Sequence, residues 1–182
     1  MSHQPAKKLY VILYSCLALF LGYFIGKQRN SVPEQTTKVV TKKKVMVSGC
    51  FDLLHAGHVA FFKEAATYGD LYVYLGSDKT ITQLKQHQPM FPQEERRYMV
   101  SAIKWVHKAK ISQGTGIMDF EAEMDVLQPD IFFVNEDGHR PSKEEACRKR
   151  NIQYIVSKRI PEKNLEARSS TAIKAALKQN KQ

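Results

Sequence analysis

From Lys44 to near the end of the chain, short apolar runs alternate with stretches that have the spacing of helices. The apolar runs, interpreted as strands, cover residues 45–48, 71–75, 106–111, 131–134 and 152–156. Helical patterns cover about residues 59–68, 93–105, 120–127 and 143–150, and a last one begins at about Ser170. Strict strand–helix alternation is typical of parallel sheets, because parallel neighbours need a long right-handed return connection. The sequence therefore predicts an α/β fold with a doubly wound parallel sheet of five strands.

The chain begins with an apolar segment that is separate from this alternating pattern. Residues 9–26 carry no charged side chain, and basic residues stand on both sides of them. As a helix the segment would be about 27 Å long, which is enough to cross the hydrocarbon core of a bilayer. A cleaved signal peptide is the alternative, but the run is long for one and no Ala-x-Ala-like cleavage site follows it. We therefore expect a single transmembrane helix at residues 9–26, preceded by a short tail at residues 1–8.

Charge and cysteine usage indicate on which side of that membrane the rest of the chain lies. More Lys and Arg follow residues 9–26 than precede them, including the run at 42–44, and the positive-inside tendency then predicts a cytosolic domain. The three cysteines are widely spaced, which argues against a disulfide framework and for a reducing compartment. We expect a single-pass membrane protein with a flexible basic linker at 27–43, a cytosolic domain at 44–178 and a tail at 179–182.

The net charge of the chain indicates which classes of molecule it could bind. A formal net charge of +10 results from 28 Lys and Arg residues against 18 Asp and Glu. Such a balance suits a polyanion such as a nucleotide, a nucleic acid or an anionic membrane surface. No stretch interleaves aromatic and basic residues like a recognisable nucleic-acid module, so we predict no nucleic-acid partner.

The stretch from Gly49 to His58, GCFDLLHAGH, has the make-up of a phosphate site. It joins the first expected strand to the first expected helix, and the first N–H groups of a helix bind anions well. His55 and His58 are spaced to share one helix face, where both can donate hydrogen bonds to phosphate oxygens. Zinc normally has three or four protein ligands, and no further cluster supplies them, so we predict no metal site.

A second polar motif is expected at the same edge of the sheet. Ser169, Ser170 and Thr171 stand at the start of the last helix, after the last strand and its loop. Plain N-capping is the simpler interpretation of such a triplet. However, ligands of doubly wound sheets bind outside the carboxyl ends of the strands, where both motifs are expected. Together the motifs predict a cradle for a nucleoside triphosphate.

Both motifs carry a resemblance to a known family. Residues 49–58 resemble the G-x-F-D-x-x-H-x-G-H signature of the cytidylyltransferase-like nucleotidyltransferase superfamily, and residues 168–174, RSSTAIK, are similar to its Ser/Thr-rich element. The resemblance covers roughly residues 44–178, with glycerol-3-phosphate cytidylyltransferases and the nucleotidyltransferase domain of ADP-heptose synthases as the most similar members. It implies a Rossmann-like fold and a transferase that moves CMP, or else AMP, from CTP or ATP to a phosphorylated small alcohol or sugar, with release of pyrophosphate.

An alternative remains open beside this activity. A catalytically inactive, membrane-tethered nucleotide-binding or scaffold protein would show the same fold, although the intact His55, His58 and 169–171 element argue against it. The resemblance also implies Mg²⁺ bound with the triphosphate, held mainly by phosphate oxygens and water. A homodimer is a possible assembly, by analogy with relatives.

The resemblance assigns roles to particular residues. His55 and His58 would stabilise the transition state, and Arg96 would act beside them. Lys85 is the best match to the family's phosphate-binding lysine, with Lys79 as the other candidate. For Asp52 we expect a structural role within the turn. The nucleotide-binding residues implied are Gly49, Cys50, Phe51, His55, His58, Asp137, Ser169, Ser170 and Thr171.

Two positions depart from the glycerol-3-phosphate pattern. Ala56 stands where those enzymes have an aromatic residue, and Asn164 stands where they have an arginine. Arg168 is close to that position but shifted along the chain. These differences leave the acceptor and the base open, and Ala56 looks more like the members that act on sugar phosphates.

Overall fold

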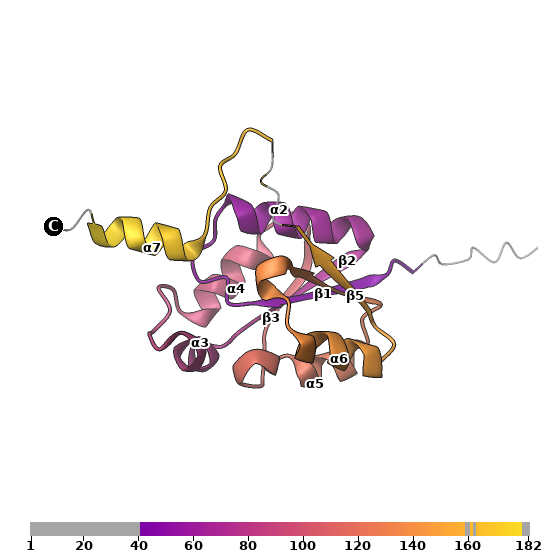
Figure 1. The fold of residues 1–182 in the computed structure, drawn as a ribbon. Helices are drawn as coiled ribbons and strands as arrows, with labels where there is room; N and C mark the ends of the chain where they lie inside the picture. Colours follow the sequence, from indigo (N-terminus) through magenta and orange to yellow (C-terminus); the bar gives the residue numbers. More distant parts are fainter. Residues whose placement is uncertain (1–40, 159–160, 162, 180–182) are drawn as a thin grey trace, which may run out of the picture. The chain divides into compact units, whose positions relative to one another are not determined.

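The computed structural model describes residues 41–158, 161 and 163–179 (Figure 1). The predicted membrane anchor at 9–26, the tail before it and most of the linker lie outside this part of the chain. Among the residues that are described, no helix is both long and apolar enough to cross a bilayer. The anchor therefore stays a prediction from the sequence.

A five-stranded parallel sheet forms the centre of the domain, as predicted. Its order is β3-β2-β1-β4-β5. The strands are β1 (Lys44–Gly49), β2 (Asp70–Leu75), β3 (Val106–Ile111), β4 (Ile131–Asn135) and β5 (Gln153–Ser157). The helices are α2 (Ala56–Ala65), α3 (Asp78–Lys85), α4 (Gln93–Ser101), α5 (Glu121–Leu127), α6 (Pro141–Lys149) and α7 (Ser170–Gln179).

Helices cover both faces of the sheet, because successive strand residues point to opposite sides. Val45 and Val47 of β1 pack in one core with Phe62 of α2 and Val100 of α4. Met46, between those two valines, packs in a second core with residues of α5 and α6. In Figure 1, α2 accordingly lies on one side of the sheet and α5 and α6 lie on the other. The doubly wound Rossmann-like arrangement is thus confirmed.

The helices differ from the predicted ones at two places, one shifted boundary and one additional helix. The first helix begins at Ala56 rather than near residue 59, because the side chain of His55 caps it. The sequence pattern also missed α3, which turns Lys85 from an expected loop residue into the last residue of a helix. Ser77 caps α3 by accepting a hydrogen bond from Thr80 N at 3.1 Å.

The switch point of the sheet lies between β1 and β4. The chain runs outward from β1 through β2 to β3, and then returns to the other side of β1 to form β4. Gly49 ends β1 and Asn135 ends β4 at the same edge. Such an edge is where doubly wound sheets bind ligands.

Candidate active site

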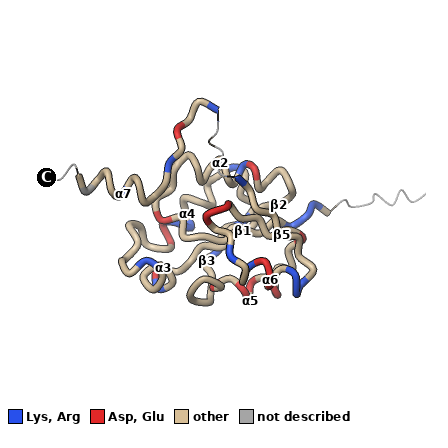
Figure 2. Tube along the Cα trace, viewed as in Figure 1, with Lys and Arg blue, Asp and Glu red and all other residues tan. Residues whose placement is uncertain are grey.

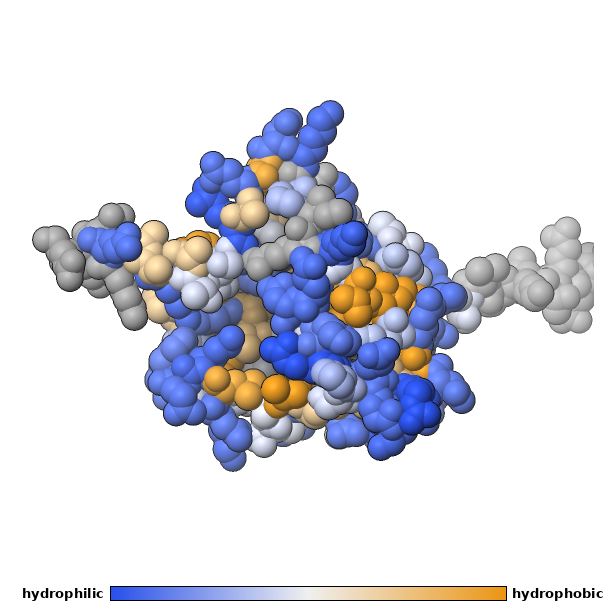
Figure 3. Space-filling view, viewed as in Figure 1, coloured by the Kyte–Doolittle hydropathy of each residue, from blue (hydrophilic) through white to orange (hydrophobic). Residues whose placement is uncertain are grey.

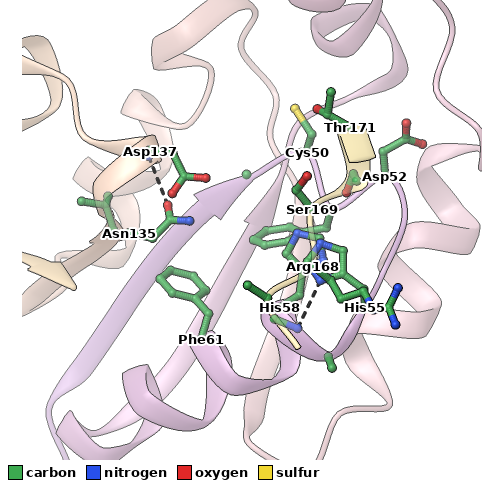
Figure 4. A pocket seen from close by; sticks show the side chains of 18 of the residues that line it. Cys50, Asp52, His55, His58, Phe61, Asn135, Asp137, Arg168, Ser169 and Thr171 are labelled. Carbon is green, nitrogen blue, oxygen red and sulfur yellow. Dashed lines mark hydrogen bonds between the residues drawn. The ribbon is translucent and has the colours of Figure 1, made fainter. Parts of the chain in front are cut away.

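A cavity of about 610 Å³ lies at this carboxyl edge and gathers both sequence motifs (Figure 4). It is lined by the turn after β1, the start of α2, the end of α3, the segment after β4, and residues 165–171 with part of α7. A volume of this size is in the range of small-molecule sites. The face in Figure 3 is mostly hydrophilic, and Lys and Arg alternate with Asp and Glu along the domain in Figure 2.

His55 and His58 form the side of the cavity that belongs to α2. Their rings stack with centroids 3.9 Å apart. The Nδ1 of His55 accepts a hydrogen bond from Gly57 N at 3.1 Å, so in the neutral ring Nε2 carries the hydrogen. The pair is therefore oriented by the helix start itself, and the donor of His55 is fixed at Nε2.

Phe51 supports the histidines from inside the core. Its ring packs edge-on against His58, with centroids 5.3 Å apart and an interplanar angle of 80°. The backbone of Phe51 has a φ of 47°, in the left-handed region that non-glycine residues rarely occupy. A Cβ atom added to Gly49 would stand 2.9 Å from the Phe51 ring, so this close approach requires glycine. The predicted Gly49-Cys50-Phe51 turn thus sits in the cavity wall in a strained conformation.

Asp52 joins three segments of the site. Its carboxylate accepts hydrogen bonds from Met90 N at 2.6 Å and from Lys174 Nζ of α7 at 2.5 Å. Burial by itself would raise the pKa of Asp52, but the hydrogen bonds from Lys174 and Met90 outweigh it and lower that pKa. The geometry matches the structural role expected for Asp52.

Arg96 lies beneath the turn rather than in the cavity wall. It is fully buried and donates to the carbonyl oxygens of Cys50 at 2.6 Å and Gly76 at 2.9 Å. It also donates to Phe91 O and pairs with Asp78 at 2.7 Å. The sequence predicted Arg96 as a catalytic residue. Its position makes it a residue that holds the Cys50 turn, because Nε and both terminal nitrogens already bind protein oxygens.

The Ser/Thr element lies against the same turn. Ser169 Oγ accepts from Ala172 N at 3.1 Å and caps α7, while Ser170 Oγ donates to Leu53 O at 3.2 Å. Thr171 lines the cavity beside them. One serine therefore does the plain capping and the other attaches α7 to the turn. The first turn of α7 and the two histidines line the same cavity, and the free N–H groups of a helix start favour an anion there.

The remaining predicted residues lie around the cavity. Lys85 and Asp137 both line it, whereas Lys79 does not. Asp137 is carried by a short turn that is fixed where Asn135 Oδ1 accepts from Gly138 N at 3.2 Å. The cavity residues that were not predicted as site residues include three basic ones, His87, Lys143 and Lys174. Lys174 stands one turn after Ser170, and that spacing could have identified it.

At the switch point of the parallel sheet, one cavity holds two stacked histidines and a capped helix start. These features define an α/β domain that binds a nucleotide and acts on its phosphates. Residues 46–176 match the family model described as cytidylyltransferase-like, and the chain belongs to that family. The resemblance stated from the motifs is thereby confirmed, and the protein is a nucleotidyltransferase of the EC 2.7.7 class.

Curated relatives agree with this assignment, and a solved structure shares the fold. The chain is 38% identical over 116 residues to an FAD synthase of Aciduliprofundum boonei, covering 62% of this chain and 75% of that protein. It is 34% identical over 134 residues to an FAD synthase of Thermococcus onnurineus, covering 72% and 87%. A lipopolysaccharide core biosynthesis protein of Thermoplasma volcanium superposes with a TM-score of 0.55 at 25% identity, covering 66% of this chain and 98% of that one.

Proposed function

We propose that this enzyme transfers AMP from ATP to the phosphate of FMN, forming FAD and releasing pyrophosphate. FAD is FMN joined to AMP through a phosphoanhydride bond, and FMN is the phosphate of an alcohol, the ribityl chain. FMN would fall within the class of acceptor predicted from the sequence, and the FAD synthase relatives favour AMP over CMP. The observation that carries the proposal is that His55, His58 and the start of α7 face one cavity.

The reaction is an in-line displacement. An oxygen of the acceptor phosphate attacks the α-phosphorus of ATP, and the bond from that phosphorus to the oxygen bridging to the β-phosphorus breaks. The acceptor oxygen is already ionised near neutral pH, so no proton has to be removed. Charge grows on the α-phosphate oxygens and on the leaving pyrophosphate. In this proposal the Nε2–H of His55, the N–H groups at the start of α7 and the ammonium of Lys85 would stabilise that charge, and the cavity lining supports this because all three residues or segments border it.

Magnesium fits this site as a companion of the triphosphate. Among the described residues, no group of three or more His, Cys, Asp or Glu side chains could hold a metal ion. The Asp52 carboxylate is occupied by Lys174 and Met90. Mg²⁺ would therefore be held by phosphate oxygens and water, where it supplies positive charge to the triphosphate.

A substrate screen tests the proposal. Pyrophosphate release is measured with ATP or CTP, each combined with FMN, glycerol 3-phosphate or a hexose 1-phosphate, and products are identified by mass spectrometry. We expect FAD and an equal amount of pyrophosphate from ATP with FMN. Turnover of a sugar phosphate in preference to FMN, or of CTP in preference to ATP, would contradict it. If no pair of substrates releases pyrophosphate, the alternative of an inactive nucleotide-binding or scaffold protein would be favoured.

We also propose that residues 9–26 anchor the enzyme in a membrane with its domain in the cytosol, where ATP is available. The uncharged run and the excess of basic residues after it support this placement. Membrane fractions washed with high salt should retain the full chain but not a chain lacking residues 1–27. Retention of the shortened chain would remove the support for the anchor. A homodimer is proposed only by family analogy, and light scattering of the purified enzyme would test it.

A further inference from the structure

Lys143 is a cation in the cavity wall that the sequence motifs do not include. It belongs to the first turn of α6, and its ammonium group donates to Gly138 O at 3.2 Å. The same group stands 5.5 Å from the centre of the Phe120 ring. The side chain is thus half-buried, between a backbone carbonyl and an aromatic face.

The surroundings of Lys143 leave its charge incompletely balanced. Burial lowers the pKa of Lys143, and the neighbouring Arg140 adds to this, while Asp119 acts in the opposite direction. Within the described part of the chain, no carboxylate forms an ion pair with the Lys143 ammonium. Lys174 differs, because Asp52 holds its ammonium at 2.5 Å. A cavity-facing ammonium without a carboxylate partner suits an anionic ligand.

Lys143 reaches the cavity from the other face of the sheet than the histidines. The histidines start α2, which packs on one face of the sheet, whereas Lys143 belongs to α6 on the other face. Figure 4 shows Ser169 and Thr171 across the cavity from Asp137, whose neighbour Gly138 binds Lys143. In-line displacement needs the attacking and leaving oxygens on opposite sides of the α-phosphorus. If pyrophosphate leaves toward the histidines and α7, the attacking phosphate enters from the side of Lys143.

We propose that the ammonium group of Lys143 binds the phosphate of the acceptor and positions it for attack on the α-phosphorus. This assignment rests on the proposed function, because it requires a phosphorylated acceptor. It gives the two anionic substrates separate cations, with Lys85 and the start of α7 for the triphosphate and Lys143 for the acceptor.

Flavin binding isolates the contact between Lys143 and the phosphate. FMN and riboflavin, which differ by that phosphate, are titrated by flavin fluorescence in the presence of α,β-methylene-ATP. The proteins are the full-length wild type, Lys143→Met, Lys143→Arg, and Lys149→Met. Lys149 is on the same helix with its side chain 66% exposed, and it is the matched control. We expect Lys143→Met to weaken FMN binding about tenfold, as for a lost hydrogen bond to a charged group, and to leave riboflavin binding within about twofold.

Steady-state rates give a second readout. Lys143→Met should raise the KM for FMN with little change in the KM for ATP, and Lys143→Arg should recover most of the loss. If Lys143→Met binds FMN and riboflavin more weakly by the same factor, or keeps the wild-type preference for FMN, the assignment of Lys143 is wrong. The proposed function would still stand in that case, provided that the wild type forms FAD. A wild type that neither binds FMN nor forms FAD overturns both. If Lys143→Met does not fold, Lys143→Gln provides the same comparison.

Discussion

The two halves of the phosphate cradle are held in different ways. The histidine half follows a turn that is held by the core of the domain. Buried Arg96 binds the Cys50 carbonyl, and the Phe51 ring packs against His58. The α7 half reaches the cavity after an exposed segment, and two side-chain bonds attach it to that turn. They run from Ser170 to Leu53 O and from Lys174 to Asp52.

This difference indicates that the α7 half takes its position from the histidine half. Both attachments of α7 end on residues of the turn that follows β1, whose shape depends on the core of the sheet. Damage to the turn should therefore disturb both halves. Damage to the attachments of α7 should leave the histidines in place, because their cap and their packing lie within residues 51–58.

The largest effect is expected from Arg96→Met. The substitution leaves Asp78 without its partner and removes the donors to the carbonyls of Cys50 and Gly76. Each buried carbonyl oxygen that is left without a donor costs about 1–3 kcal/mol, and the turn should lose its shape as well. Urea unfolding and pyrophosphate release measure the two losses. Arg97→Met removes only an exposed pair with Glu94 and is the control; equal stability of the two variants would contradict the role of Arg96.

His58→Ala comes next and separates chemistry from folding. The ring lies in the cavity wall and stacks on His55. If the proposed reaction takes place in this cavity, the loss of the ring removes a hydrogen-bond donor to the reacting phosphates. We expect pyrophosphate release to fall by about 10²–10³-fold while the unfolding transition remains cooperative. His107→Ala alters an exposed ring on β3, outside the cavity, and should leave the rate unchanged. Near-normal turnover by folded His58→Ala would exclude the histidine from the reaction.

Asp52→Asn tests the link between the halves through its dependence on pH. The pKa of Asp52 is lowered from 3.8 in the folded protein, so the carboxylate stabilises the fold above that value. This contribution is lost as the pH falls through the folded pKa. We expect Asp52→Asn to be less stable by about 1.5–3 kcal/mol at pH 7, with the difference shrinking toward pH 3. Urea unfolding at pH 7, 5 and 3 measures it, and a difference that does not depend on pH would show that the Lys174 pair contributes nothing.

The sequence predicted those elements of the site that follow from local pattern and from the connection of strands and helices. His55 and His58 were identified because a strand, a glycine-containing turn and a helix start follow one another within a few residues. The element at 169–171 was placed at the same edge because the carboxyl ends of parallel strands meet there. Both predictions needed only the period of the apolar residues and the rules of chain connection.

What the sequence did not predict depends on contacts between distant segments. Arg96 was expected at the phosphates, yet it binds the Cys50 carbonyl, 46 positions earlier in the chain. Helix α3 was missed because only Thr80 and Ile81 of its residues are buried, which leaves no apolar stripe. The sequence analysis assigned no role to Lys143, and it is the packing of α6 on the sheet that brings this residue to the cavity wall. Tertiary contacts of this kind leave no periodic signal.

The smallest effect, from Ser170→Ala, tests the comparison most directly. The variant loses the bond from Ser170 Oγ to Leu53 O, while Ser169 still caps α7. A neutral hydrogen bond contributes about 1 kcal/mol, so the KM for ATP should rise about fivefold with little change in kcat. Ser101→Ala removes a similar bond, to Tyr98 O, at the exposed last residue of α4 outside the cavity wall, and should leave the KM unchanged. If Ser170→Ala lowered kcat as strongly as His58→Ala, the two halves would act as one unit, and the independence of the histidines from α7 would be wrong.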